Sequence, residues 1–346
     1  MPTFSSLSRL VWNLARGRPI LAIFEVCLRC NSKCGYCNLP LNKGHYELSR
    51  EEIRRVFSRL YQYDGIQYLF VQGGEPLLRK DILEILEDLG GMGYWLGLVT
   101  NGTLLSPPMV KRLAQLPLTI SVSLDSLNRD RYRTIRGADQ LPQVLQGIRN
   151  LAEFPHPKYL ACIVNEANRQ DVLKVARFAQ HHGFIPVIGA YHWGIERYGK
   201  VDLALQYDRA AAVKVFQQVL ASGLVPRGYF RRYIGDNIQW LKGKSLDPCD
   251  AGRYSVSIDA SGNVAPCYAL QSSGNLLESS LDDILSRMDR DAIKRCSDKS
   301  SCNLLCSRIV GSTLRHPISA LLTPRSQAPI RHCPSHFQNE RFKPFP

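Results

Sequence analysis

The chain has 346 residues, of which 45% are hydrophobic and 21% are charged, and it contains 11 cysteines. Its 44 basic and 30 acidic side chains give a formal net charge of +14, which would attract nucleic acid, anionic lipid surfaces or acidic proteins. This composition excludes collagen-like, coiled-coil and wholly disordered chains. The cysteines are too sparse for a small disulfide scaffold and too numerous for a chance set of buried thiols.

Two features of the sequence favour reduced thiols. The first 24 residues lack the compact apolar core of a signal peptide, because Arg9, Arg16 and Arg18 interrupt them. No stretch reaches the roughly 18 uncharged apolar residues of a membrane span. We therefore expect a cytoplasmic protein without a membrane span, in which clustered cysteines are more often metal ligands than disulfides.

Short apolar runs alternate with amphipathic segments over residues 21–225, after a helical segment over residues 1–20. We predict strands at 21–26, 68–71, 96–99, 119–124, 159–164 and 185–191, with helices at 49–61, 80–89, 108–116, 142–154 and 169–181 between them. Repeated strand-helix units are typical of a parallel sheet or barrel. Six units predict an α/β fold, a partial (β/α)6 TIM-like barrel, with its site at the C-terminal ends of the strands.

The pattern loses its regularity after about residue 225. A β-hairpin is predicted next, with strands at 255–259 and 263–268 around a turn at 260–262. A loop-rich, cysteine-containing segment follows, and from Pro317 the sequence becomes a tail rich in Pro, Arg and His. We predict a small, loop-rich C-terminal extension over residues 226–346 that bound metal holds together.

Cys30, Cys34 and Cys37 follow the first predicted strand with the spacing CxxxCxxC. Three thiolates on one loop can bind three irons of a four-iron cluster and leave the fourth iron open to a ligand from outside the protein. A structural zinc site needs a fourth protein ligand, for which Cys27 is the only local candidate. Taken alone, the triplet therefore leaves zinc open as an alternative to an iron-sulfur cluster.

Polar or glycine-containing segments follow the later predicted strands. They are Gly73, Gly74, Glu75 and Pro76 after the second strand, Thr100, Asn101 and Gly102 after the third, Ser123, Leu124 and Asp125 after the fourth, Arg136 farther on, and Asn165 with Asn168 after the fifth. Each segment alone is equally consistent with a turn or a helix cap. Their order is more informative, because each follows a different strand at the end where a barrel places its site.

Together, these motifs resemble the radical S-adenosylmethionine (radical SAM) superfamily, and the resemblance covers the whole predicted barrel. It implies that Cys30, Cys34 and Cys37 hold a [4Fe-4S] cluster that binds S-adenosylmethionine and cleaves it to a 5'-deoxyadenosyl radical. The implied cofactor contacts are Tyr36, Gly73, Gly74, Glu75, Pro76, Asn101, Ser123, Asp125, Arg136 and Asn165. The radical would abstract a hydrogen atom from a substrate that the protein positions and shields from solvent.

The remaining cysteines form a second group near the C-terminus. Cys249 and Cys267 occur as C-x12-G-x4-C, and Cys296, Cys302 and Cys306 follow as C-x5-C-x3-C, with Cys333 alone near the end. This pattern resembles the SPASM or twitch extension of radical SAM enzymes, which carries auxiliary iron-sulfur clusters. The bottom-up alternative is a zinc ribbon or a set of unpaired thiols.

The second group departs from the full SPASM pattern at Ile293, where a further cysteine is expected. By correspondence with the family, Cys249, Cys267 and Cys306 would hold an inner cluster, and Cys296, Cys302 and Cys333 an outer one. Each set is then one thiolate short, and Asp247, Asp250 or Asp291 could complete a site. We expect two auxiliary clusters in preference to one.

Two cysteines remain outside these sets. Cys27 and Cys162 lie in apolar strands, where packed thiols are expected. Cys162 is also a candidate to donate a hydrogen atom to a substrate radical. Tyr191, His192 and Trp193 leave the sixth strand toward the expected site, where they would line a substrate pocket or pack in the core.

Relatives with such extensions modify peptides or oxidise and epimerise small molecules. We predict a peptide-modifying maturase of the kind that makes ribosomally synthesised, modified peptides (RiPPs), acting by crosslinking or epimerisation. The alternatives are an aminocyclitol or sugar dehydrogenase or epimerase, and a non-catalytic electron relay. The segment before the first strand is too short for the leader-binding module of many peptide modifiers, so a separate leader-binding protein is a possible partner.

The basic charge suits a redox partner. Cluster reduction requires a donor of the flavodoxin or ferredoxin type, which is usually acidic, and a basic face would steer its docking. Nucleic-acid binding is not expected, because the sequence lacks a recognisable binding module.

Overall fold

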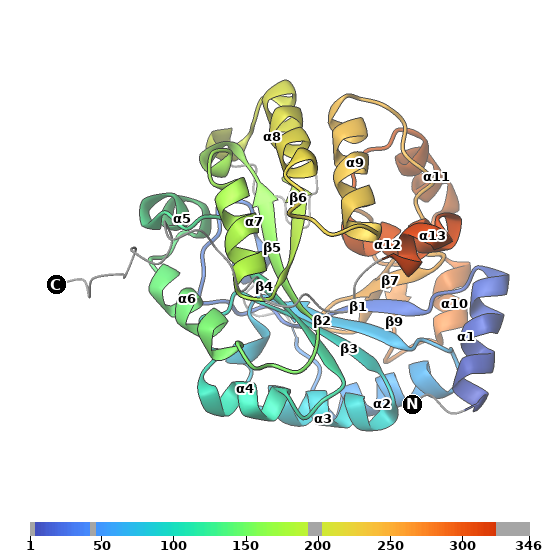
Figure 1. Ribbon diagram of the computed structural model, residues 1–346. Helices are drawn as coiled ribbons and strands as arrows, with labels where there is room; N and C mark the ends of the chain where they lie inside the picture. Colours follow the sequence, from blue (N-terminus) through green and yellow to red (C-terminus); the bar gives the residue numbers. More distant parts are fainter. Residues whose placement is uncertain (1–3, 42–45, 193–202, 323–346) are drawn as a thin grey trace.

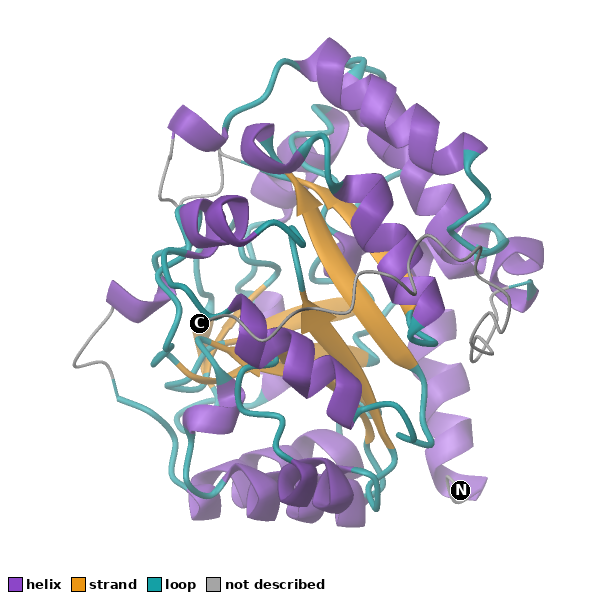
Figure 2. Ribbon diagram, turned by 60° about the vertical axis from the view of Figure 1, so that its left-hand side comes forward, coloured by secondary structure: helices purple, strands orange, loops and turns teal. Residues whose placement is uncertain are grey.

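The computed structural model describes residues 4–41, 46–192 and 203–322. Its core is one nine-stranded sheet with the strand order β6-β5-β4-β3-β2-β1-β7-β8-β9. Helices surround the strands on the outside (Figures 1 and 2). Trp193 and Cys333, both named in the sequence predictions, lie outside the described residues.

The six predicted barrel strands are present and pair in parallel. They are β1 (Leu21–Cys27), β2 (Tyr68–Gly73), β3 (Trp95–Thr100), β4 (Leu118–Ser123), β5 (Lys158–Val164) and β6 (Ile185–Ala190). All seven residues of β1 are buried, as expected for a parallel strand covered on both faces. The partial barrel is confirmed, with strand ends that differ from prediction by one or two residues.

The five predicted barrel helices are also present. They are α2 (Arg50–Gln62), α3 (Ile82–Met92), α4 (Pro107–Leu113), α6 (Leu141–Asn150) and α7 (Val172–His181). Helix α2 shows why they form: Ser49 and Glu52 make a reciprocal capping box at its start. Before them, α1 (Phe4–Arg16) is held at the N-terminal end of the strands, where Asn13 Nδ2 donates to the carbonyls of Pro19 and Asp64.

Seven helices of the described chain had no counterpart in the sequence prediction: α5 (Arg129–Arg136), α8 (Arg209–Ala221), α9 (Tyr229–Leu241) and the four later helices of the C-terminal extension, whose bounds are given below. The expectation that regular structure ends near residue 225 was therefore wrong. In α9 the apolar face is largely aromatic and is interrupted by Arg231, Arg232 and Asp236, which obscured its helical period. Helix α9 contacts both β6 and α12 (Leu305–Arg315), so it joins the barrel to the C-terminal region.

The predicted hairpin is present as β7 (Ser255–Ile258) and β8 (Asn263–Ala265). Strand β7 also pairs in parallel with β1, with Leu21 opposite Ser255. The extension therefore continues the sheet of the barrel. Its remaining elements are β9 (Gly274–Asn275), α10 (Leu281–Ser286), α11 (Arg290–Asp298), α12 and α13 (Pro317–Leu321). Short 3-10 turns occur at Leu39–Leu41 (η1), Pro76–Leu78 (η2), Glu166–Asn168 (η3) and Leu203–Leu205 (η4).

The extension also covers part of the barrel interior. Ile23 of β1 packs with Tyr268 and Cys302 in a small cluster, to which Phe70 and Cys306 add their side chains. Ile23 and Phe70 face each other across paired strands. Cysteines of the C-terminal region therefore touch the inside of the barrel.

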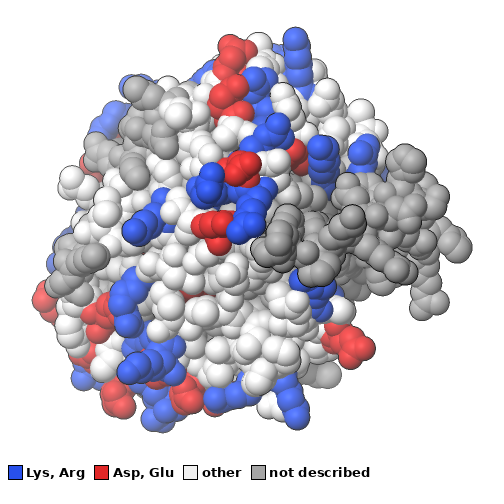
Figure 3. Space-filling view, turned by 90° about the vertical axis from the view of Figure 1, so that its left-hand side faces the viewer, with Lys and Arg blue, Asp and Glu red and all other residues white. Residues whose placement is uncertain are grey.

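Basic and acidic side chains are mixed on the surface around α5. Arg129, Arg131 and Arg133 of α5 form ion pairs with Asp139, Asp171 and Asp130, respectively. Figure 3 shows basic side chains lying among acidic ones on the described part of that face. This distribution gives no support to a nucleic-acid surface there. No helix among the described residues is long and apolar enough to cross a membrane.

Helix α12 is fixed against the cysteine-containing segment at a point with no free space. A Cβ on Gly311 would lie 1.7 Å from Asp250 Oδ2, a carboxylate that Arg315 binds at 3.1 and 2.6 Å. We expect Gly311→Ala to lower the free energy of unfolding by about 1–3 kcal/mol, because the methyl group forces helix and carboxylate apart. Chemical denaturation of the cluster-free protein measures this change.

Gly235→Ala is the matched control, since it also lies inside a helix but has open space around its Cβ position. That substitution is expected to be neutral or to stabilise by up to about 1 kcal/mol. Equal effects of the two substitutions would show that the close packing at Gly311 does not matter.

Candidate active site

The cysteine loop leaves the end of β1 in close contact with the end of β2. Gly74 N–H donates to the Cys27 carbonyl at 2.8 Å, and Glu75 N–H donates to the Arg29 carbonyl at 2.7 Å. A Cβ on Gly73 would lie 2.2 Å from the Cys27 oxygen, and one on Gly74 would lie 2.1 Å from the Arg29 oxygen. Glycine at both positions therefore leaves the space that the backbone of the cysteine loop occupies.

Glu75 connects this junction to the next strand. Its Oε1 accepts hydrogen bonds from Thr100 Oγ1 at 2.7 Å and from Leu77 N–H at 3.1 Å, while Oε2 accepts from Asn101 N–H at 2.7 Å. Burial raises the pKa of Glu75 to about 7, although these three donors act in the opposite direction. The carboxylate therefore fixes the ends of β2 and β3 beside the cysteine loop.

Cys30, Cys34 and Cys37 lie half-buried on this loop and close to one another. Burial raises the pKa of all three thiols, to about 12 for Cys37, and the charges of the neighbouring cysteines raise the pKa of Cys30 and Cys37 further. Asn101 Nδ2 lies 4.0 Å from Cys30 Sγ, and Arg136 Nη1 lies 3.9 Å from Cys34 Sγ. Donors thus face the sulfurs, as suits thiolates that carry negative charge.

The donor set fits a multinuclear cluster better than a single ion. Among the described residues, no three His, Cys, Asp or Glu side chains converge closely enough to hold one metal ion. A cluster of several irons needs one thiolate for each liganded iron, spread around its surface. The three thiols on one loop meet this requirement.

A buried ion pair lies next to the triplet. Arg136 Nη2 contacts Asp125 Oδ2 at 2.8 Å, and Tyr36 Oη donates to the same oxygen at 3.0 Å. The other carboxylate oxygen accepts from Ile163 N–H at 2.8 Å. The structure therefore brings Tyr36, Asp125 and Arg136 together within reach of Cys34, although they come from the cysteine loop, the end of β4 and α5.

Other residues that the sequence predicted for the site lie in different surroundings from this ion pair. The fully buried Asn165 caps η3 and donates to the Ile163 carbonyl, so its amide serves the backbone. Ser123 is half-buried at the end of β4, and the buried Pro76 begins η2. Cys162 is fully buried with its sulfur 3.8 Å from the Asp125 carbonyl. Cys27 is also fully buried, as expected of packed thiols.

The barrel interior holds polar residues that the sequence analysis missed. Glu25 lies fully buried in β1, directly opposite Gln72 of β2, and Gln72 donates to the hydroxyl of Tyr268. An acidic residue within the apolar run of β1 was the available signal. Tyr191, at the end of β6, is buried beside Tyr36 with ring centroids 5.9 Å apart.

Five cysteines of the second group lie close together. The charges of Cys249, Cys296 and Cys306 act on Cys267, whose pKa burial raises to about 12. The thiols of Cys296 and Cys302 contact each other, and the hydrogen bond from Cys302 lowers the pKa of Cys296. The charge of Cys296 on Cys267 runs between the expected inner and outer sets, whereas the contact of Cys296 with Cys302 lies within the outer set. The described part of the chain therefore brings these five thiols into one group.

Two of the three aspartates proposed to complete this group have side-chain partners elsewhere. Asp250 is buried and bound by Arg315, and Asp247 accepts from His316 Nε2 at 2.8 Å and Arg232 Nη2 at 3.1 Å. Asp291 is exposed on α11. The polar contacts of Asp247 and Asp250 instead attach α9 and α12 to the segment that contains Cys249.

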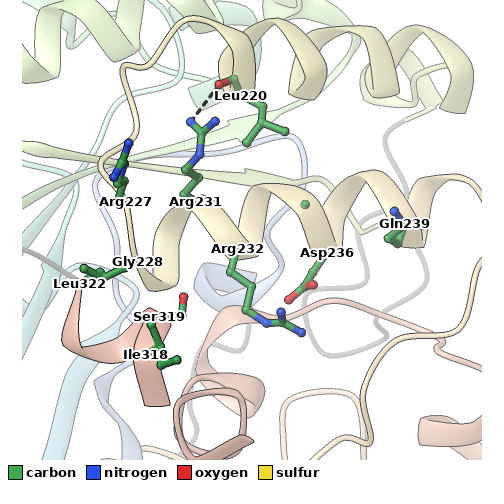
Figure 4. Close-up of a pocket in the computed structure, with 11 residues that line it drawn as sticks. Leu220, Arg227, Gly228, Arg231, Arg232, Asp236, Gln239, Ile318, Ser319 and Leu322 are labelled. Carbon is green, nitrogen blue, oxygen red and sulfur yellow. Dashed lines mark hydrogen bonds between the residues drawn. The ribbon is translucent and has the colours of Figure 1, made fainter. Parts of the chain in front are cut away.

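A cavity of about 750 Å³ lies on the outer side of α9, facing α8 and α13. Figure 4 shows Arg227, Arg231 and Arg232 around it, with Ile318 at one side, and the Arg231 guanidinium donating to the Leu220 carbonyl. Its α9 residues lie on the face opposite Tyr233 and Asn237, which are buried. The cavity therefore lies away from the strand ends and contains none of the predicted site residues.

Comparisons with known proteins agree with this geometry. The family model of the radical SAM superfamily matches residues 24–179, and the model of an iron-sulfur cluster-binding domain named SPASM matches residues 249–308. A probable GTP 3',8-cyclase of Saccharolobus solfataricus is 31% identical over 262 residues, covering 72% of this chain and 83% of the relative. One from Saccharolobus islandicus is 35% identical over 248 residues, covering 69% and 79%.

Solved structures share the fold at low sequence identity. SuiB of Streptococcus suis superposes with a TM-score of 0.65 at 17% identity, covering 88% of this chain and 76% of that protein. SuiB bound to precursor peptide SuiA gives 0.64 at 16% identity, covering 81% and 67%. The structure of anSMEcpe with AdoMet and the Cp18Cys peptide gives 0.60 at 19% identity, covering 82% and 83%.

The buried carboxyl of Glu75 gives a prediction for stability against pH. Its pKa rises from 4.5 to about 7 in the folded chain, so the folded state binds more protons and loses stability as pH rises through this range. We expect this group to remove roughly 3 kcal/mol between pH 4.5 and 8. Denaturation of the cluster-free protein over that pH range measures the loss.

Glu75→Gln is expected to flatten that dependence. Asp64, whose pKa burial raises to about 6, titrates in both proteins and cancels from the difference between their curves. Parallel curves for the wild type and the variant would show that Glu75 is ionised throughout the range.

Proposed function

The chain belongs to the radical SAM superfamily and carries a SPASM domain, and we propose that it is an oxidative peptide-modifying enzyme. Its cofactors are S-adenosylmethionine and [4Fe-4S] clusters. The substrate proposed is a peptide that enters the barrel from the C-terminal ends of the strands. The observation that carries this proposal is the contact of Cys302 with Ile23 inside the barrel.

Each group of residues in the site has its own role in the initiating step. Cys30, Cys34 and Cys37 would hold the cluster, which when bound supplies the electron that cleaves S-adenosylmethionine. Arg136 offers a buried positive charge beside Cys34, and Asp125 and Tyr36 hold that guanidinium in place. Glu75 keeps the ends of β2 and β3 against the loop. The buried setting excludes water from the radical.

The SPASM cysteines favour an oxidative reaction. Crosslinking two positions of a peptide removes two hydrogens: the deoxyadenosyl radical takes one as an atom, and the other leaves as a proton and an electron. The electron needs an acceptor near the substrate. A cluster held by the thiols that touch the barrel interior at Ile23 would lie where it could accept that electron.

The structural relatives support a peptide as the substrate class. SuiB binds its precursor peptide SuiA and anSMEcpe binds the Cp18Cys peptide, and both share this fold. A reductant of the flavodoxin or ferredoxin type and a separate leader-binding protein are the partners proposed. The second candidate is a small-molecule reaction on a nucleotide or sugar, which the 31–35% identity to probable GTP 3',8-cyclases favours.

Substitution of the triplet tests the initiating step. We expect Cys34→Ala to abolish 5'-deoxyadenosine formation from S-adenosylmethionine and dithionite, because one iron loses its ligand. Cys162→Ala, a buried thiol outside both groups, is the control and should retain it. Chromatographic quantification after anaerobic reconstitution gives both rates. A wild-type protein that forms no 5'-deoxyadenosine would be an electron relay.

Substrate class is tested with two kinds of probe. Synthetic peptides corresponding to short reading frames beside the gene, and GTP, are each incubated with reduced enzyme and S-adenosylmethionine. We expect a peptide to lose 2 Da, the mass of roughly two hydrogens, with matching 5'-deoxyadenosine, and GTP to remain unchanged. Mass spectrometry reads both outcomes. Conversion of GTP with no change in any peptide would favour the second candidate.

A further inference from the structure

Arg308 is a buried cation without a carboxylate partner among the described residues. It lies in the first turns of α12 and is 7% exposed. Its Nη1 donates to the Asp247 carbonyl at 2.6 Å and its Nη2 to the Cys302 carbonyl at 3.4 Å, while Nε is buried without a hydrogen-bond partner. Arg315, on the same helix, is instead bound by the carboxylate of Asp250.

An unpaired buried charge is costly, so a counter-charge is expected near Arg308. Isolated buried ions cost several kcal/mol even after relaxation, and carbonyl contacts do not neutralise them. The thiols of the second cysteine group lie near Arg308, which bonds to the carbonyl of Cys302 and lies two residues beyond Cys306. The charge of Arg308 also reaches Asp236, but the two side chains form no ion pair. A [4Fe-4S] cluster bound by cysteines carries about two negative charges in its oxidised state.

We propose that Arg308 is the charge partner of the auxiliary iron-sulfur cluster and raises its reduction potential. The inference rests on the auxiliary cluster of the proposed function and does not depend on the substrate. Reduction adds a negative charge to the cluster, and a nearby fixed positive charge stabilises the reduced state. Because Arg308 is buried, solvent and salt screen this effect little.

Contacts from residues other than Arg308 also fix the backbone around Cys302. Tyr233 Oη donates to the Asn303 carbonyl at 3.0 Å, and Trp240 Nε1 donates to the Ser300 carbonyl at 2.9 Å. Both donors come from α9 and not from α12, which carries Arg308. The loop is thus anchored independently, and the charge of Arg308 can be removed while its fold is kept.

The test is a redox titration of the reconstituted holoenzyme followed by electron paramagnetic resonance. Addition of S-adenosylmethionine changes the signal of the cluster that binds it and so identifies the auxiliary signal. We expect Arg308→Gln to make the auxiliary cluster about tenfold harder to reduce, a shift of about 59 mV for one electron. Arg308→Lys, which retains the charge, should recover most of that difference.

Arg295→Gln is the matched control, because Arg295 adjoins Cys296 in sequence but is 65% exposed and faces Asp289. It should change the reduction equilibrium less than about twofold, since solvent screens an exposed charge. Iron and sulfide are assayed in every variant. Loss of auxiliary iron in Arg308→Gln that Arg308→Lys restores would support the charge role through assembly.

Three results would overturn the inference. An unchanged potential in Arg308→Gln with full iron content would leave Arg308 a structural residue, as would loss of iron in both Arg308 variants. An equal shift in Arg295→Gln would show that the effect is not specific to the buried site. A wild type without auxiliary iron would instead remove the auxiliary cluster from the proposed function, whatever Arg308 does.

Discussion

The arrangement of the site depends on how closely two backbones approach where β1 and β2 end. The chain after β1 runs so near the Gly73-Gly74 segment that neither position has room for a side chain, and two hydrogen bonds join the segments there. This junction sets where the cysteine loop begins. Glu75 then fixes the end of β3 relative to this junction, because its two oxygens accept hydrogen bonds from Thr100 and Asn101. The cysteines, the ion pair of Asp125 and Arg136 and the barrel mouth are all placed relative to this contact.

The C-terminal region is attached to the same frame by a strand. Because β7 pairs with β1, the second cysteine group is held to the strand that leads into the first. Its thiols meet the barrel interior at Ile23, and α9 and α12 close around them. The two cysteine groups are therefore attached to one continuous sheet, which fixes their separation. In the proposed reaction, this sheet would be the rigid frame across which an electron passes from substrate to auxiliary site.

Much of this could be predicted from local patterns. Apolar runs gave the six barrel strands, and cysteine spacing gave both thiol groups, because both signals lie within short segments. What the sequence analysis missed depends on distant contacts. Helix α9 has an aromatic face that only its packing on β6 identifies. The tight space at Gly73 and Gly74, the engagement of Asp247 and Asp250 by arginines, and the union of five thiols in one group all arise from segments far apart in sequence.

The pairing of β1 with β7 also constrains the order in which the chain can fold. Strand β1 is made early and is wholly apolar except for Glu25, yet one of its edges stays unpaired until residues 255–258 have been synthesised. An exposed apolar strand edge invites pairing with other chains, and pairings between segments so distant form slowly. The cysteine loop continues directly from this strand. Its thiols are therefore synthesised before the segment that pairs with the second edge of β1.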